Sequence, residues 1–266
     1  MKTSAKIPHS SLCRKVSFTL PDCWEKLSQT QLRQVLSLYA VLADQSEGMQ
    51  EVKLAAFCKF CSVRIVKRAD GGWVCRKMMT DEEFLLDPAL LPDILAPLDF
   101  IDHPEEMTIR LESVGGYKAV DMFLHGVRFA DYLTLENYYQ GYLLGRDNFN
   151  LRVMTRMLYG MTEEDGKLLR PEVLLGTFLW YGAVKHHFAV MFPNFFKPAS
   201  KGGGSDTGTA EGQREMMNIQ IRMLTKGDVT KTGAVMESDV WDALTELDAQ
   251  AKEAEEMKRK YKNHGK

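Results

Sequence analysis

Three cysteines have a spacing that raises the question of a metal site. Cys58 and Cys61 are separated by two residues, and Cys75 follows fourteen residues later. A structural zinc ion needs four thiolate or imidazole ligands, and the spacing singles out no fourth ligand, although Cys23 and His103 are available. The cysteine pair also ends a predicted helix, where cysteine packs as a small apolar residue. Since no βαβ pattern precedes the pair, a thioredoxin-type redox role is not indicated. We predict no metal and no cofactor.

The histidines offer the other chemistry in the chain. His125 has Asp121 and Asp131 near it in sequence, which is the composition of an acid–base pair. His186 and His187 are adjacent, so on a helix their side chains point about 100° apart and do not share one metal ion. We interpret these histidines as core or surface residues and predict no catalytic residues. A hydrolase or transferase with a site around His125 or His186 remains an alternative.

The glycine pairs and the basic residues indicate no nucleotide site. The glycines at 71–72, 115–116 and 202–204 lack the G-x-x-x-x-G-K-[ST] and G-x-G-x-x-G patterns. The chain of 266 residues has a formal net charge of −2 and a pI near 6.3, whereas nucleic-acid-binding domains carry a basic excess. We therefore expect no nucleic-acid partner. The arginines of the predicted hairpin and the basic tail support one alternative, a DNA-associated regulator of a mobile element.

The composition predicts a soluble, cytoplasmic protein. Hydrophobic residues make up 45% of the chain, enough for a sizeable core. The first fifteen residues contain no apolar segment of a secretory signal. The longest nearly uncharged stretch, Val173 to Val184, is shorter than the roughly 20 residues that a membrane-spanning helix needs. We expect no membrane partner, and we expect the five cysteines to be reduced thiols.

The first third of the chain predicts helices around a small β-hairpin. Val16, Phe18 and Leu20 alternate as in a strand, and Ser28 to Gln31 form a capping box for a helix that ends near 43. A second helix is predicted over 49–60. The hairpin is predicted near 63–77, because Asp70-Gly71-Gly72 supplies turn residues, and its exposed face would carry Arg64, Arg68 and Arg76.

The next stretch predicts short elements. Thr80 to Glu83 match a second capping box, which predicts a short helix over Phe84 and Leu85. Four prolines at 88, 92, 97 and 104 then limit the chain to turns and short helical pieces. A strand is predicted over 108–111.

The stretch from Tyr117 to Tyr159 is the richest in aromatic and aliphatic residues, and we interpret it as the hub of a helical core. Thr134 is the predicted N-cap of one helix, which ends at Gly145. A second helix over 148–158, stopped by Gly160, would direct Phe149, Val153 and Leu158 inward. Pro171 then begins an apolar helix, 173–191, of the kind that is buried on all sides.

A Gly/Ser-rich linker is predicted to separate the body from the end of the chain. We divide the chain into a mainly helical body at 1–198, a flexible linker at 199–212 and a C-terminal helical segment at 213–266. The predicted fold class is mainly α (α+β). The last helix carries a narrow apolar seam suited to a partner helix. The predicted partner-binding residues are Val240, Trp241, Leu244, Leu247, Ala251, Ala254 and Tyr261.

Two stretches resemble a known group of sequences. They are FTLPDCWEKLSQTQLRQVLSLYA, from Phe18 to Ala40, and LTKGDVTKTGAVMESDVWDALTELDAQAKEAEEMKRKY, from Leu224 to Tyr261. They are similar to the two ends of uncharacterised prophage-encoded proteins of gut anaerobes. The resemblance implies a component of a phage or phage-derived particle, of the kind of tail-assembly chaperones, which are largely helical and bind another structural protein. This chain differs from those chaperones in its length and its hairpin.

These observations predict a non-enzymatic structural or assembly protein that acts through protein–protein contacts. The expected partner is a protein, such as a phage structural protein. A linker that tethers an amphipathic helix raises the local concentration of that helix near its target, which suits such a role.

Overall fold

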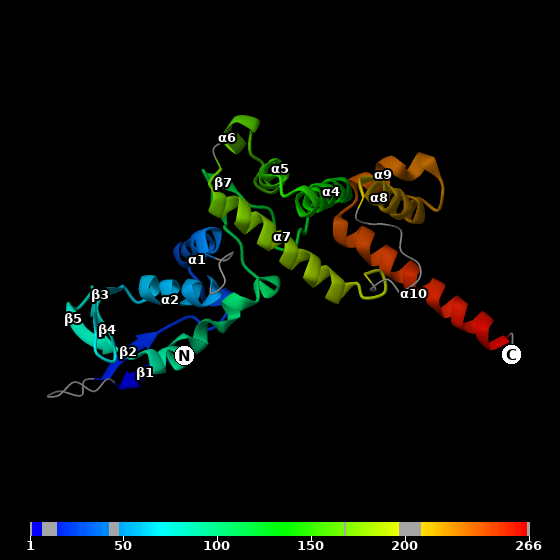
Figure 1. Ribbon diagram of the computed structural model, residues 1–266. Coiled ribbons are helices and arrows are strands. Elements are labelled where there is room, and N and C mark those ends of the chain that lie inside the picture. Colours follow the sequence, from blue (N-terminus) through cyan, green and yellow to red (C-terminus); the bar gives the residue numbers. More distant parts are fainter. Residues whose placement is uncertain (1, 7–14, 43–47, 168, 197–208, 265–266) are drawn as a thin grey trace. The chain divides into compact units, whose positions relative to one another are not determined.

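A computed structural model describes residues 2–6, 15–42, 48–167, 169–196 and 209–264 (Figure 1). It confirms the predicted class, mainly α with small antiparallel sheets. The chain forms two compact units: unit 1 comprises 1–111 and 171–176, and unit 2 comprises 112–170 and 177–266. These boundaries differ from the predicted body at 1–198, because the C-terminal helices pack on the helices of the hub. Of the predicted linker at 199–212, residues 199–208 lie outside the described residues, and residues 210–212 form the start of a helix.

Unit 1 combines two long helices with small sheets and short helical turns. Its elements are β1 (Lys2–Lys6), β2 (Lys15–Thr19), η1 (Trp24–Lys26), α1 (Gln29–Leu42), α2 (Gly48–Phe60), β3 (Val63–Ala69), β4 (Gly72–Lys77), β5 (Glu82–Leu86), η2 (Pro88–Leu90), α3 (Leu91–Leu95), η3 (Ala96–Asp102) and η4 (Pro104–Glu106). β1 pairs with β2, and β3, β4 and β5 form a second antiparallel sheet in that order. The short elements from Pro88 to Glu106 confirm the effect predicted for the four prolines.

The capping box at the start of α1 forms as predicted. The Gln31 amide donates to Ser28 Oγ at 3.2 Å, and the Ser28 amide donates to Gln31 Oε1 at 2.9 Å. Such reciprocal bonds satisfy two backbone donors that have no partner inside the helix. Leu32, Val35 and Leu36 of this helix are buried at spacings of three and four, so the apolar stripe of α1 lies in the core of unit 1.

The hairpin of β3 and β4 confirms the prediction for 63–77, but its exposed face differs. Arg64 lies opposite Arg76, so these two share a face. An irregularity in the pairing between Ile65 and Lys67 places Arg68 opposite Trp73 instead. Arg68 therefore does not join the predicted row of three arginines.

Two predictions for the stretch after the hairpin are wrong. Residues 82–86 form strand β5 rather than a helix, because pairing with β4 buries Phe84 and Leu86 on one face of the sheet. A five-residue helix would gain little by comparison, since helix initiation is costly. The residues at 108–111 form no strand in the structure.

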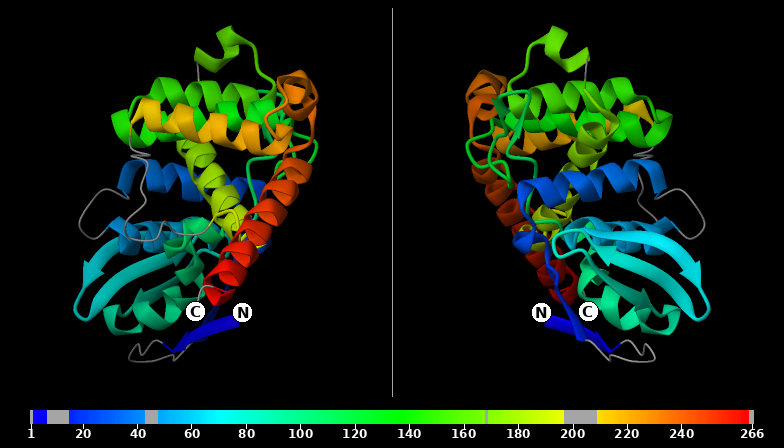
Figure 2. Two further views of the ribbon diagram at one scale, coloured as in Figure 1. Left: turned by 90° about the vertical axis from the view of Figure 1, so that its right-hand side faces the viewer. Right: turned by 90° about the vertical axis from the view of Figure 1, so that its left-hand side faces the viewer.

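Unit 2 is an assembly of helices with one two-stranded ribbon. Its elements are β6 (Ser113–Val114), β7 (Tyr117–Lys118), α4 (Phe129–Gly145), α5 (Asn148–Tyr159), α6 (Glu163–Lys167), most of α7 (Pro171–Met191), α8 (Ala210–Thr225), η5 (Val229–Lys231), α9 (Thr232–Glu237) and α10 (Val240–His264). Helix α7 also contributes 171–176 to unit 1. Figure 2 shows α8 running beside α4, and the two helices are in contact.

The helices of the hub follow the prediction in type but not in every residue. Helix α4 begins at Phe129 rather than at Thr134, whose hydroxyl donates back to the Ala130 carbonyl within the helix at 2.9 Å. Helix α5 ends at Gly160, which has a φ of 61°, as predicted for a helix stop. Phe149 is 57% exposed rather than buried, because the inward stripe of α5 begins two residues later at Leu151.

Helix α7 begins at Pro171 as predicted, and its apolar residues are buried around much of its circumference. In unit 2, Trp180 and Tyr181 are each 1% exposed, and the Trp180 indole donates to the Met122 carbonyl at 2.8 Å. Within the described residues, no helix combines the length and the apolar character that crossing a membrane requires.

Candidate functional site: helix α10 and its aromatic base

Helix α10 is fixed at its start by the segment that precedes α4. The Val240 amide donates to the Val127 carbonyl at 2.9 Å, and the Phe129 amide donates to the Ser238 carbonyl at 2.8 Å. The Asp239 carboxylate accepts from the Gly126 amide at 2.6 Å and also caps α10 by accepting from the Trp241 amide at 2.7 Å. The chain therefore enters α10 in a defined direction.

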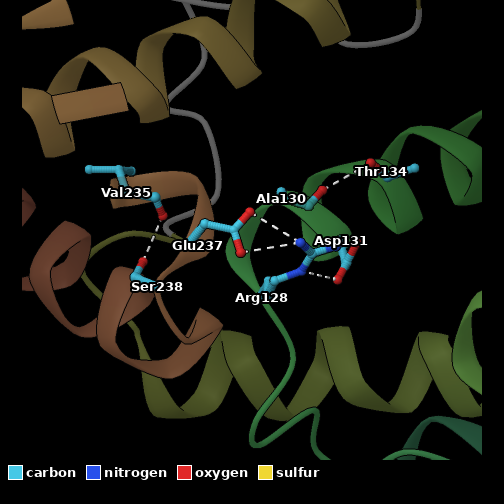
Figure 3. A network of polar contacts seen from close by, with 7 residues as sticks. All are labelled: Arg128, Ala130, Asp131, Thr134, Val235, Glu237 and Ser238. Carbon is cyan, nitrogen blue, oxygen red and sulfur yellow. Dashed lines mark hydrogen bonds and ion pairs between the residues drawn. The ribbon is translucent and has the colours of Figure 1, made fainter. Parts of the chain in front are cut away.

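An arginine joins α9 to α4 beside this junction. Arg128 donates to both oxygens of Asp131, at 2.9 and 3.1 Å, and to the Glu237 carboxylate at 3.1 and 3.2 Å. Figure 3 shows its guanidinium between the two carboxylates. These bonds raise the pKa of Arg128 and leave the Asp131 carboxylate engaged. Arg128 and Glu237 are exposed and Asp131 is half-buried, so we attribute to these groups the orientation of α9 rather than much stability.

Aromatic rings form the base on which α10 rests. The Trp241 indole donates to the Phe123 carbonyl at 2.8 Å, and its ring stacks on His125 with a centroid distance of 4.3 Å and an interplanar angle of 14°. Phe188 and Phe192 of the α7 region contact the same indole edge to face, at 5.5 and 5.4 Å. Aromatic pairs of this geometry each contribute about 0.5–1.5 kcal/mol beyond burial. Trp241 is thus an anchor of α10.

Two histidines of unit 2, His125 and His187, take part in this packing. His187 stacks on Phe123 at 4.0 Å, and burial together with nearby His125 and His186 lowers the pKa of His187, which favours the neutral ring. Asp121, the carboxylate that the sequence offers to His125, instead accepts from the backbone amides of Phe123 and His125 at 2.9 and 3.2 Å. The acid–base pair considered for His125 is not formed.

A second attachment holds the middle of α10. The Asp248 carboxylate accepts from the Asn194 amide at 2.7 Å, the Asn194 side chain at 2.8 Å and the Phe195 amide at 3.0 Å. The turn after α7 is therefore bonded to α10. Sequence reasoning missed Asp248, because a single acidic residue on a polar helix face carries no sign of a partner 54 residues away.

The predicted seam divides into a buried part and an exposed part. Val240, Leu244 and Leu247 are 0% exposed and pack within unit 2, so they are unavailable to another protein. Ala251 is half-buried, whereas Ala254 is exposed and Tyr261 is 78% exposed. Figure 1 shows the red end of α10 extending past α8 and α9.

Met257 belongs to the exposed part, and the sequence prediction omitted it. It is 57% exposed and lies three residues after Ala254 and four before Tyr261, so the three residues share one face of the helix. The i, i+3, i+7 spacing of Ala254, Met257 and Tyr261 is the sequence signal from which Met257 could have been predicted. The exposed seam therefore consists of Ala254, Met257 and Tyr261, and we use that name for these three residues below.

The cysteines do not form a metal site in the described part of the chain. Cys58, Cys61 and Cys75 have no disulfide, and no group of three or more His, Cys, Asp or Glu residues there is placed to hold a metal ion. Burial raises the pKa of the Cys61 and Cys75 thiols to about 11. Cys75 is buried and Cys61 is half-buried, and neutral thiols in such surroundings behave as small apolar groups.

The arginines of the hairpin differ in their charge environment. Arg76 donates to Glu83 at 2.7 and 3.2 Å and lies 3.5 Å from Asp81, so its charge is locally compensated. Arg64 faces it across the strand pair and is exposed. The net positive charge that this face of the hairpin offers to a nucleic-acid backbone is therefore smaller than the two arginines alone would give.

No protein-family model, curated protein or solved structure matches this chain.

Proposed function

We propose that this chain is a non-enzymatic assembly protein that binds another protein through the exposed seam of α10. The observation that carries the proposal is the division of one apolar stripe: its first half anchors the helix in unit 2, and its second half faces solvent. A helix held at one end presents its free end in a fixed orientation, which reduces the entropy that a partner must remove on binding.

The chemistry of the exposed seam suits a helical partner. Met257 and Tyr261 provide a flexible thioether and an amphipathic ring, and tyrosine is enriched among residues that dominate binding energy. Lys258, Arg259 and Glu256 flank the seam and are exposed, so charged residues border an apolar strip. A second helix with apolar residues at spacings of three and four would complete this arrangement.

The proposed context is the cytoplasmic assembly of a phage or phage-derived particle. It rests on the resemblance of Phe18–Ala40 and Leu224–Tyr261 to prophage-encoded proteins. The second of these stretches includes the exposed seam, so the partner we propose is a phage structural protein, such as a tail protein. The stacked histidines and the engaged Asp121 carboxylate support a binding role over an acid–base role.

Co-purification with phage structural proteins encoded beside its gene tests the proposal. The full chain is co-expressed with each capsid and tail protein in turn, and the dissociation constant of any complex is measured. We expect one such complex, weakened at least about 30-fold when Met257 and Tyr261 are both replaced by alanine, because a hot-spot residue contributes about 2 kcal/mol.

Val229→Ala is the matched control. Val229 is 81% exposed in the same unit but lies outside α10, so its replacement removes a comparable exposed apolar group and leaves affinity unchanged. If no structural protein encoded nearby binds, or if the double variant binds as tightly as the unaltered chain, the proposal is overturned.

A further inference from the structure

Unit 2 contains a cavity of about 360 Å³ that none of the features above uses. It is lined by residues of α4, α7 and α8 and by the turn that follows α7. Ligand sites in proteins begin at roughly 300 Å³, and a cavity of about 150 Å³ suffices for benzene. The space therefore accommodates a molecule of one or two fused rings.

The apolar part of the lining comes from two pairs of residues. Phe195 and Phe196 lie edge to face, with ring centroids 4.8 Å apart and planes at 77°. Met216 and Met217 of α8 line the same cavity and are half-buried. Methionine side chains adapt to the shape of a guest and make favourable contacts with aromatic rings. A flat apolar ring is the shape that these two pairs would enclose.

The charged groups of the lining compensate each other. Lys185 and Glu136 form an ion pair, and Glu136 also accepts from Gln140 at 2.7 Å and from the Tyr181 hydroxyl at 3.4 Å. The Lys185 ammonium lies 5.2 Å from the centroid of the Tyr139 ring. With both charges engaged inside the protein, the cavity favours a neutral ligand over an anion or a cation.

One polar atom of the lining lacks a partner. Gln220 Oε1 is buried and accepts no hydrogen bond from any of the residues that the structure describes. Leaving a buried acceptor without a donor is costly, so nearly all such groups in folded proteins have a partner. A carbonyl oxygen can only accept, and the missing group is therefore an N–H or O–H donor.

We propose that this cavity binds a neutral, planar aromatic molecule that carries an N–H donor, such as an indole. The ring lies against Phe195, Phe196 and the two methionines, and the N–H donates to Gln220 Oε1. The site shares no residue with the exposed seam, so it stands or falls independently of the proposed assembly function.

Titration of the full chain with indole and with benzofuran tests the proposal. The two molecules have the same shape, but benzofuran has an oxygen in place of the N–H. Binding is followed by isothermal titration calorimetry and by saturation-transfer NMR. We expect indole to bind with a dissociation constant of roughly 0.1–1 mM, which is ordinary for so small a ligand. We expect benzofuran to bind about 10-fold more weakly, because one hydrogen bond is lost.

Two variants assign the binding to this cavity. Gln220→Met keeps the length of the side chain and removes the acceptor, so it should reduce indole affinity about 10-fold and leave benzofuran affinity unchanged. Met217→Trp fills the cavity and should abolish binding of both, with folding checked by circular dichroism. If it fails to fold, the comparison of the two ligands on the unaltered chain and on Gln220→Met still decides.

Three results would overturn the proposal. The first is the absence of saturable indole binding to the unaltered chain. The second is equal affinity for indole and benzofuran that Gln220→Met leaves unchanged, which would remove the assigned donor. The third is full indole binding by a folded Met217→Trp variant, which would locate the ligand elsewhere.

Discussion

Replacing Trp241 by alanine should destabilise unit 2, whereas replacing Tyr261 by alanine should not. Both aromatic residues belong to the predicted seam, but only Trp241 is anchored: it donates to the Phe123 carbonyl, stacks on His125 and contacts Phe188 and Phe192. Large-to-small substitutions of packed aromatic residues cost about 3–5 kcal/mol. Since the indole is half-buried, we expect about 3 kcal/mol for Trp241→Ala.

The intermediate variant separates the hydrogen bond from the packing. Trp241→Phe retains a ring but leaves the Phe123 carbonyl without its donor, which costs about 1–3 kcal/mol. Tyr261 is 78% exposed, so Tyr261→Ala should change the free energy of unfolding by no more than about 0.5 kcal/mol.

Urea unfolding followed by far-ultraviolet circular dichroism measures all three variants. In thermal unfolding, 3 kcal/mol corresponds to a decrease in Tm of roughly 6–12 °C for a unit of roughly 150 residues. Equal stabilities of Trp241→Ala and Tyr261→Ala would refute the reasoning, because the anchored and exposed parts of the helix would then be energetically alike.

Two further predictions concern the hub and the thiols. Leu158→Ala should lower the free energy of unfolding by about 2–5 kcal/mol, because Leu158 is 1% exposed. The control Leu144→Ala, at a 57% exposed site of α4, should lower it little. Equal losses of the two variants in urea unfolding would contradict this prediction. Burial raises the pKa of Cys61 and Cys75 to about 11, so at pH 8 about one thiol in a thousand is ionised, and iodoacetamide should label both far more slowly in the folded chain than in urea. Because the unfolded thiols ionise near pH 8.5, their contribution to stability is complete below that pH and is lost as the pH rises through about 11. Labelling at equal rates in the folded and unfolded chain, measured by mass spectrometry, would show that the fold does not protect these thiols.

The proposed binding surface is smaller than the sequence predicts. A free amphipathic helix over the whole seam would offer seven residues to a partner, but Val240, Leu244 and Leu247 already pack within unit 2. About eleven residues remain from Ala251 to Tyr261, which span roughly 16 Å of helix. So short a helix is marginal alone, and its attachment through Asp248 and Trp241 explains how it keeps its form.

The candidate cavity could not be predicted from the sequence, because its lining residues are far apart in the chain. Its lining combines Glu136 and Lys185, 49 residues apart, with Met217 and Gln220 of a helix that follows the predicted linker. Methionine and glutamine on an amphipathic helix carry no sign of the cavity, because neither residue type has a fixed role. Only the packing of α8 beside α4 leaves Gln220 Oε1 buried with no donor among the described residues.

Local sequence determined much of the secondary structure of this protein. The capping box at Ser28, the helix start at Pro171, the helix stop at Gly160 and the turn at Asp70-Gly71 all form where the residues predict. Each depends on hydrogen bonds or backbone angles within about four residues, so the information is contained in the segment itself.

The tertiary structure decided those features that depend on contacts between residues far apart in the chain. Residues 82–86 form a strand because β4 supplies its hydrogen bonds, and the first turns of α10 are an anchor because Phe123 and Gly126, more than a hundred residues earlier, bond to them. A stripe of apolar residues predicts that one face of the helix is buried, but it does not identify the element or the protein that covers that face. In α10 the stripe is covered by its own unit as far as Leu247, and the exposed seam beyond remains for a partner.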